Sequence, residues 1–426
     1  MPQVVAAPTP SCACCAFSSL GSDLFLPRSN ERDSTIDKPE EHNSSSSSNL
    51  SATNKSDDII APREAWDRIL ASSSGSSLHR PILLVDTHGH PHLQREVQYA
   101  SHDDDDGIDD NYSTMMQSSI AGESVVSLTC AVSPLDWKVA LEYASQSSRI
   151  LPALGIHPWY LGDILVNDNN INKNNKESQS NNIERYIDWR WLNDLETHLS
   201  EHPRLIIGEI GLCKMARFVQ DFPKNNGGKA TAIALQKLVF SKQLQLAARW
   251  LRPVTVHCVD AHGMFMETLW EILQQVKEDS CPEEVKDDGK KRWRTAFPSA
   301  IAMHSFTGTA HQVNEILAFE RALLDPEDDE DGNKAILFYF GVSHSINHLM
   351  CTSEKSRKKG MEAIRSIPAN RLLVESDVHA SVDVTLGTAG AVAYAAHVRD
   401  ERIEDVATLC VGNGLRFLSS QGWRSI

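Results

Sequence analysis

Eight short runs of apolar and β-branched residues, separated by longer amphipathic stretches, constrain the fold of this chain more than any other feature. Runs that are apolar throughout are typical of parallel strands buried on both faces of a sheet. Eight such strands alternating with helices close most simply into a barrel. The sequence therefore predicts an α/β fold, a (β/α)₈ TIM barrel. The predicted strands are residues 81–86, 124–130, 150–155, 204–209, 253–258, 299–304, 335–341 and 371–377.

Helices are expected between the strands. The clearest spans residues 231–251, where an apolar residue recurs every three or four positions. The polar stretches that remain are expected to be loop insertions that leave the scaffold intact. The other predicted helices are 134–148, 188–201, 261–278, 310–323, 354–366, 389–399 and 402–420, and the predicted insertions are 101–122, 163–184, 221–230, 279–296 and 324–334.

The first 60 residues differ in composition from the rest. They are rich in Ser, Asn, Asp and Pro, include the serine run 44–48, and lack the periodicity that a packed core needs. We expect a disordered low-complexity tail over 1–60, a lead-in helix and linker over 61–80, and the barrel domain over 81–426. The tail and the long loops offer surfaces for a protein partner.

Net charge and cysteine content limit the partners and the cellular compartment that we expect for the protein. The net charge of −16 argues against non-specific binding of nucleic acid over the whole surface, and the acidic clusters at 103–110 and 325–331 are interpreted as solvated loops. The nine cysteines are odd in number and form no opposed CxxC pairs, which indicates reduced thiols in the cytoplasm or nucleus. No apolar run approaches the roughly 18 residues of a membrane span, and the first residues do not resemble a secretory signal, so no membrane association is expected.

Residues able to bind a metal stand at the carboxyl ends of five predicted strands, and in a barrel those ends share the face that carries the active site. The first strand leads into Asp86, His88 and His90, which alternation places on one side, where the two imidazoles suit one divalent ion. Asp86 is expected to accept a hydrogen bond that fixes a ligand. A shifted register that uses His90 and His92 stays open, but it loses the acid two residues upstream.

The other strand ends supply Glu209, His257, His304 and Asp377. A carboxylate after an apolar run, such as Glu209, is costly to bury unless it is paired or coordinates a cation, and its two oxygens can bridge two metals. Taken singly, each residue has a plainer interpretation, a rim salt bridge for a carboxylate or a hydrogen-bonded core imidazole for a histidine. Together, at the same end of five strands, they favour a metal site.

The ligand set also bears on the metal and on the substrate. Four imidazoles and two carboxylates suit Zn²⁺, Mn²⁺ or Co²⁺ better than Ca²⁺, and the count is enough for two ions that share a bridging group. The expected cofactors are two divalent metal ions, Zn, Mn, Mg or Co. Their charge exceeds that of Glu209, Asp377 and Asp86 together, so the pocket can stay positive and accept an anionic phosphate ester.

Six motifs resemble those of the TatD family of metal-dependent deoxyribonucleases, within the amidohydrolase superfamily, and most nearly its fungal branch of cell-cycle-protein-interacting homologues. The resemblance covers roughly Pro81 to the C-terminus. Its motifs are DTHGHP (86–91), GIHPWY (155–160), GEIGL (208–212), PVTVHCVDAHG (253–263), HSFTG (304–308) and LLVESD (372–377).

The resemblance implies phosphodiester hydrolysis by a metal-activated hydroxide in a two-metal site, with DNA or another phosphodiester as substrate. Asp377 and Glu209 would be the catalytic residues, and Asp377 would accept the proton. His157 would lie near the substrate and contact phosphate, or would be structural. The implied ligands are His88, His90, Glu209 and Asp377 for one ion and Glu209, His257 and His304 for the other.

Three positions depart from the family pattern. The family often has Asp at Cys213, Arg at Val259 and Thr at Ser376; none of these changes removes a proposed ligand, but the missing basic side chain weakens the case for phosphate binding. Two alternatives stay open, a metal-dependent amide or ester hydrolase of the same superfamily and a non-catalytic interaction protein that retains the barrel. Glu209, in place of the carbamylated lysine of many such hydrolases, favours the nuclease branch over the first. The intact ligand set argues against the second.

Overall fold

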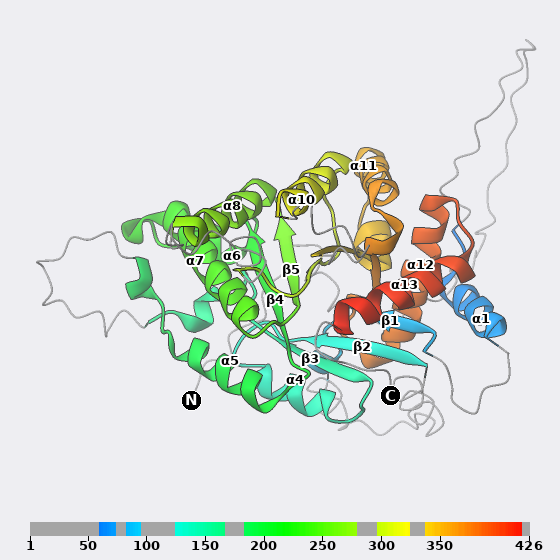
Figure 1. The fold of residues 1–426 in the computed structure, drawn as a ribbon, viewed down its shortest axis with the longest axis horizontal. Helices are drawn as coiled ribbons and strands as arrows, with labels where there is room; N and C mark the ends of the chain where they lie inside the picture. The colour runs from blue at the N-terminus through cyan, green and yellow to red at the C-terminus, as the bar shows by residue number, and fades with distance from the viewer. Residues whose placement is uncertain are drawn as a thin grey trace, which may run out of the picture.

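Eight parallel strands form the centre of the molecule. The computed structural model describes residues 59–73, 82–94, 124–166, 183–278, 296–323 and 337–419, and within these ranges each strand pairs with the next along the chain (Figure 1). All eight overlap the ranges predicted from the sequence. They are β1 (Leu84–Asp86), β2 (Val125–Cys130), β3 (Ile150–Leu154), β4 (Ile206–Cys213), β5 (Val254–Val259), β6 (Ile301–Met303), β7 (Phe338–Ser343) and β8 (Leu372–Glu375).

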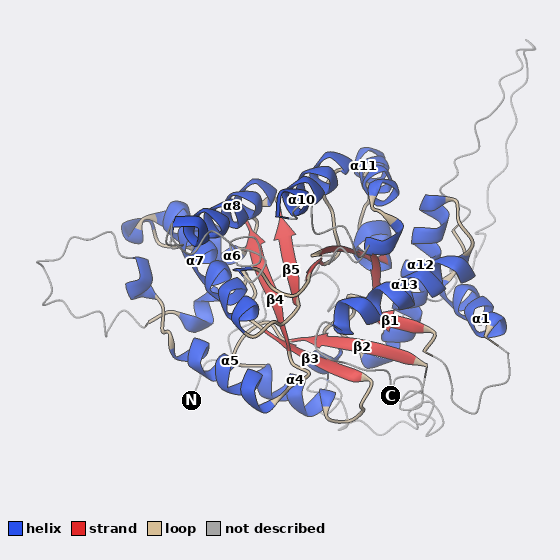
Figure 2. Ribbon diagram, viewed as in Figure 1, coloured by secondary structure: helices blue, strands red, loops and turns tan. Residues whose placement is uncertain are grey.

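The first and last strands meet where the barrel closes. The Thr87 amide donates to the Val374 carbonyl at 3.3 Å, and the Thr87 hydroxyl donates to the same oxygen at 3.1 Å. Helices form an outer layer around the strands (Figure 2). The prediction of a (β/α)₈ barrel is therefore confirmed.

The helices follow the strands and cover the outside of the barrel. The expected lead-in helix is α1 (Pro62–Ser72), which begins with a proline, as suits a first helical position, and packs against the last two helices. None of the described helices is long and apolar enough to cross a membrane. The others are α4 (Trp137–Ala144), α5 (Arg190–Glu201), α6 (Arg217–Asp221), α7 (Gly228–Arg249), α8 (His262–Glu278), α10 (Ala310–Leu323), α11 (Glu354–Ser366), α12 (Val384–Arg399) and α13 (Ile403–Ser419).

Two apolar clusters follow the alternation of the strands. Outward-facing strand residues pack under the helices, and inward-facing ones fill the barrel together with Phe417 of α13. Toward the carboxyl ends the inward positions become polar. On β5 the inward series runs from Thr255 to His257, and on β8 it runs from Leu373 to Glu375. Because successive side chains alternate and all strands point the same way, these polar groups gather at one mouth of the barrel.

Three segments differ from the sequence-based prediction. Residues 221–230 are not a polar loop, because they hold the end of α6, the short helix η8 (Lys224–Asn226) and the start of α7, joined at Gly227, whose φ is 94°. α12 begins at Val384 rather than 389, because it is buried on nearly all sides and so shows no amphipathic period. The π-helical turn η12 (Ser345–Leu349) after β7 was not expected. The predicted tail, both acidic clusters and most other predicted insertions lie outside the described residues.

Candidate active site

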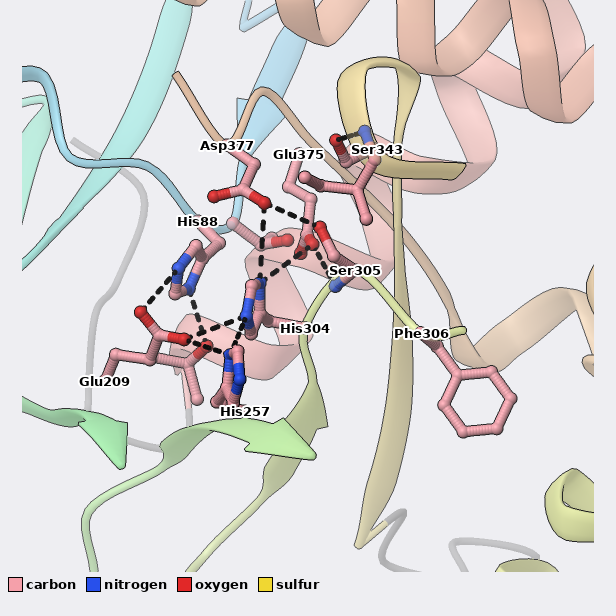
Figure 3. Close-up of polar contacts among 12 residues, drawn as sticks. His88, Glu209, His257, His304, Ser305, Phe306, Ser343, Glu375 and Asp377 are labelled. Carbon is pink, nitrogen blue, oxygen red and sulfur yellow. Dashed lines mark hydrogen bonds and ion pairs between the residues drawn. The ribbon is translucent and has the colours of Figure 1, made fainter. Parts of the chain in front are cut away.

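Glu209 lies at the centre of the polar mouth of the barrel. The pairing of β4 with β5 shifts between Ile207 and Ile210, so Glu209 is displaced from the regular ladder, and its side chain points inward among the histidines (Figure 3). Only 2% of the residue is exposed. Beside it, a Cβ at Gly211 would collide with the backbone of His257, so glycine is what allows the two strands to approach this closely.

One oxygen of Glu209 faces the two histidines that follow β1. Oε2 lies 3.4 Å from Nε2 of His88 and 3.3 Å from Nε2 of His90. Asp377, directly after β8, places Oδ1 3.9 Å from the same nitrogen of His90. These four residues are the set that the resemblance assigns to one ion.

The other oxygen of Glu209 faces histidines from three different strands. Oε1 lies 2.8 Å from Nε2 of His304, 3.0 Å from Nδ1 of His257 and 3.3 Å from Nε2 of His157. His304 also stacks on His88, with ring centroids 3.9 Å apart, and therefore borders both groups. The other five predicted ligands, and His157 with them, gather around this one carboxylate.

The hydrogen bonds behind the imidazoles leave nitrogens free to bind a cation. Nδ1 of His90 lies 2.6 Å from the Cys130 carbonyl, which can only accept, so in the neutral ring the lone pair is on Nε2, toward Glu209. Nδ1 of His88 pairs with the Thr255 hydroxyl at 2.8 Å, and its Nε2 is buried without a hydrogen bond. Metal-binding histidines are held by a partner on the far ring nitrogen in this way. The residues present therefore fit a divalent metal.

Two further carboxylates contact the segments that carry the proposed ligands. Asp86 accepts hydrogen bonds from both the amide and the hydroxyl of Ser376, at 2.8 and 2.7 Å, so it anchors the segment that carries Asp377 rather than a histidine ring. Glu375 accepts the Ser305 amide and lies 3.5 Å from Nδ1 of His304. The Ser305 hydroxyl donates to Oδ2 of Asp377 at 2.9 Å.

The electrostatics of the site depend on Glu209. Burial acts to raise its pKa, but the imidazoles of His157, His304 and His88 outweigh burial and hold the pKa well below its usual range. Burial acts to lower the pKa of His257, yet the Cys213 thiol and Glu209 raise it to about 10. At His157 burial dominates and lowers the pKa to about 4. Cations entering this site would replace protons on its histidines.

Two glutamines of α7 position the neighbouring backbone. Gln243 accepts the Ile156 amide at 2.7 Å and donates to the Ile156 carbonyl at 3.2 Å, which fixes the residue before His157. Gln236 bonds both the amide and the carbonyl of Cys213 at the end of β4. Both side chains are fully buried. The helix is therefore tied to the two strands that supply His157 and Glu209.

The structure also decides between the two registers that the sequence left open for the histidines after β1. His92 does not reach Glu209, because its two ring nitrogens lie 2.8 Å from the Thr129 hydroxyl and 3.2 Å from Oδ2 of Asp136. The register that uses His92 as a ligand is therefore wrong. Sequence reasoning missed the supporting roles of Thr255 and Glu375. Their one signal was the inward position of each, two residues before His257 and Asp377.

Comparisons with known proteins identify the family of this chain. A family model described as TatD related DNase matches residues 85–419. The Cut9-interacting protein scn1 of Schizosaccharomyces pombe is 26% identical over 67% of this chain and 89% of its own length. A 3'-5' ssDNA/RNA exonuclease TatD of Klebsiella pneumoniae is 28% identical over 42% of this chain and 47% of its own length.

Among solved structures, a TatD homologue of Escherichia coli superposes with a TM-score of 0.48 at 18% identity, over 79% of this chain and 97% of that one. An uncharacterised amidohydrolase of Saccharomyces cerevisiae superposes with a TM-score of 0.49 at 14% identity, over 78% of this chain and 98% of that one. The family match extends from the last residues of β1 through α13 and so includes every residue around Glu209. This chain belongs to the TatD family of deoxyribonuclease-related hydrolases.

Proposed function

We propose that this protein hydrolyses phosphodiester bonds in DNA, with two divalent cations that Glu209 and the histidines around it would hold. One observation carries the proposal: the two oxygens of a single buried carboxylate face two different sets of imidazoles. Oε2 faces His88 and His90, and Oε1 faces His257 and His304. A carboxylate shared in this way supports a pair of ions rather than one.

Bound cations would lower the pKa of water and neutralise the oxygens of a phosphate. The chain itself would supply the acceptor for the proton of the attacking water. Asp377 suits this role because His304, His88 and His90 outweigh its burial and lower its pKa, which keeps it ionised. Its Oδ2 is held by Ser305, while Oδ1 faces His90 and remains available.

His157 is proposed to steady Glu209 rather than to bind phosphate. Its Nδ1 accepts the Trp159 amide at 3.2 Å, so in the neutral ring the N–H is on Nε2 and points at Oε1 of Glu209. With the residue only 3% exposed, little of the ring is available to a substrate. This assignment differs from the phosphate contact implied by the resemblance.

The charge of the metal-loaded pocket and the similarity to a named exonuclease indicate which substrate to test. Two divalent ions would leave the pocket positive, which suits a phosphodiester. The relative from Klebsiella pneumoniae is named as an exonuclease on single-stranded DNA and RNA. Single-stranded DNA is accordingly the first substrate to test, with Zn²⁺, Mn²⁺, Mg²⁺ and Co²⁺ each as the added metal.

The test replaces the shared carboxylate. Glu209→Ala should abolish metal-supported release of nucleotides from single-stranded DNA and reduce bound metal, measured by elemental analysis, from two ions per chain toward none, with the fold retained by circular dichroism. Glu404→Gln, which loses a surface pair with Arg68, is the control and should retain both properties. Wild type that binds metal but cleaves only amides or carboxylic esters would favour the alternative hydrolase. Wild type that binds no metal would leave the barrel as an interaction protein.

A protein partner is a second, compatible proposal. It is favoured by the name of the Schizosaccharomyces pombe relative, which describes an interaction with another protein, and by the coverage of 89% of that relative. Affinity capture with the full chain, compared with a chain that starts at residue 59, tests whether the N-terminal segment binds such a partner. Equal capture by both would place the contact on the barrel.

A further inference from the structure

A pocket outside the ring of histidines is lined by the chain segments that follow two of the proposed ligands. Its volume is about 280 Å³, and its walls come from the segments that follow β5 and β6 and from α11. Cys258, in one wall, follows His257 directly, and Phe306, in another, is two residues beyond His304. The pocket therefore lies along the two segments that carry these proposed ligands, and it includes neither of them.

The walls of this pocket combine groups that suit a nucleotide. Lys359 contributes a cation from α11, Asp260 an acceptor, and Thr307 a hydroxyl. Gln312 adds an amide whose oxygen is already engaged by the Thr309 amide at 2.8 Å, so its NH₂ group is the part available to a ligand. One cation for a phosphate, with neutral and acidic partners for a sugar or base, matches the functional groups of a nucleotide.

The apolar wall of the pocket is fixed before any ligand binds. The ring of Phe306 packs edge-on against Phe340, with centroids 5.1 Å apart, and points away from Glu209 (Figure 3). A Cβ at Gly308 would collide with this ring, so the wall depends on glycine there. Asn347 of η12 donates to the Phe306 carbonyl at 2.9 Å and ties this segment to β7.

Lys359 is the pocket's source of positive charge. The side chain is exposed and forms no salt bridge to a described residue, whereas the nearby His262 is paired with Glu315 at 3.0 Å. No described lysine or arginine contacts Glu209 or the imidazoles around it, so the inner site offers no basic side chain to a second phosphate. The cation at the pocket wall can supply that contact.

We infer that this pocket binds the nucleotide next to the bond that is cleaved, and that Lys359 binds its phosphate. The inference rests on the proposed function and makes it more specific: the substrate is a strand with at least two phosphates, one at Glu209 and one at Lys359. A pocket of about 280 Å³ has the size of a small-ligand site, which suits a single nucleotide. Lys359 thus determines affinity for a strand, while the histidines and Asp377 determine the reaction.

The test uses the full-length protein loaded with metal and compares two substrates. A short single-stranded oligonucleotide offers a second phosphate, and bis(p-nitrophenyl) phosphate does not. Lys359→Ala should raise KM for the oligonucleotide about tenfold, with kcat within about twofold, because one charge-assisted contact is lost. Hydrolysis of the small diester should not change. Lys359→Arg should restore KM, and Lys359→Glu should raise it further.

Matched controls lie on the same helix. Lys355 and Lys358 are exposed on α11 but do not line the pocket. Their alanine variants should leave KM near that of wild type, and only Lys359→Ala should reduce the salt dependence of binding, by about one phosphate contact. An equal rise in KM for all three variants, or an unchanged KM for Lys359→Ala, would overturn the inference.

Binding of a fluorescent oligonucleotide, followed by anisotropy, separates this inference from the proposed activity. If wild type cleaves neither substrate, the proposed function fails. The pocket is then still judged by binding, where Lys359→Ala should weaken affinity about tenfold relative to wild type. Equal binding of wild type and Lys359→Ala would reject the pocket even in an active enzyme.

Discussion

Two groups of histidines in this barrel differ in what lies beside them. In the candidate active site the imidazoles surround Glu209, and the pKa of His304 is raised well above its usual value despite burial. His344 and His348 lie before and within η12, with ring centroids 5.2 Å apart, and His348 packs against Tyr394 of α12. Burial, together with the neighbouring His348, lowers the pKa of His344 to about 3, and burial with the charges of Arg357 and His397 lowers the pKa of His348. Burial acts to lower the pKa of the histidines in both groups, and at His304 the neighbouring Glu209 outweighs it.

The largest effect is expected when the histidines of the candidate active site lose the negative charge of Glu209. Glu209→Gln keeps the shape of the side chain but removes its charge, so the metal-free pKa of His257 should fall from about 10, although the Cys213 thiol still acts to raise it. Metal binding and cleavage should fall by about three orders of magnitude or more. Imidazole titration by NMR, with metal removed by a chelator, measures the pKa change. A His257 that still titrates near 10 in the variant would show that Cys213, not Glu209, controls it.

A smaller loss is expected when Glu209 and the imidazoles stay and Asp377, proposed as both a ligand and the proton acceptor, loses its charge. Asp377→Asn should lower kcat by about a hundredfold to a thousandfold, with a smaller change in KM, because the amide cannot accept a proton. The variant should retain most of its bound metal, since Glu209 and the imidazoles are unchanged. Steady-state kinetics with metal analysis on the same sample check this. A loss of both ions together with activity would make Asp377 mainly a ligand.

The second histidine group should matter for stability in acid and not for catalysis. The folded pKa of His344, about 3, lies below its unfolded value of about 6.5, so the unfolded chain takes up the proton first. His344 therefore has no effect on the free energy of unfolding above pH 6.5. As the pH falls from 6.5 toward 3, it lowers that free energy by about 1.4 kcal/mol per pH unit. His344→Gln should flatten that part of the curve of unfolding free energy against pH, measured by urea denaturation.

The control for that experiment is an exposed histidine. His311→Gln, on the outer face of α10 where the side chain is 82% exposed, should leave the acid slope unchanged. Both variants should retain metal binding at neutral pH. Identical slopes for His344→Gln and wild type would mean that the folded protein accepts a charge at this position, which would remove the contrast between the two groups.

The sequence predicts the strands and the side chains at their ends, because both depend on short-range alternation. Asp86 to His90 and Glu375 to Asp377 can be assigned to one mouth from their positions after apolar runs alone. The groups behind them could not be assigned, since the Cys130 carbonyl behind His90 and Gln243 behind Ile156 depend on how distant segments align. The same limit explains α12, whose small apolar residues show no period because the helix is buried all round.

The contact between β1 and β8 determines when the site is completed during synthesis of the chain. Asp86 and Ser376 are 290 residues apart, and their hydrogen bonds hold the segment that delivers Asp377 to the histidines after β1. A ribosome-bound chain that has emerged only as far as β7 contains every proposed histidine ligand but lacks the acid that completes them. The proposed activity would therefore appear late in synthesis, when the final strand docks, and a chain truncated before that point would lack it.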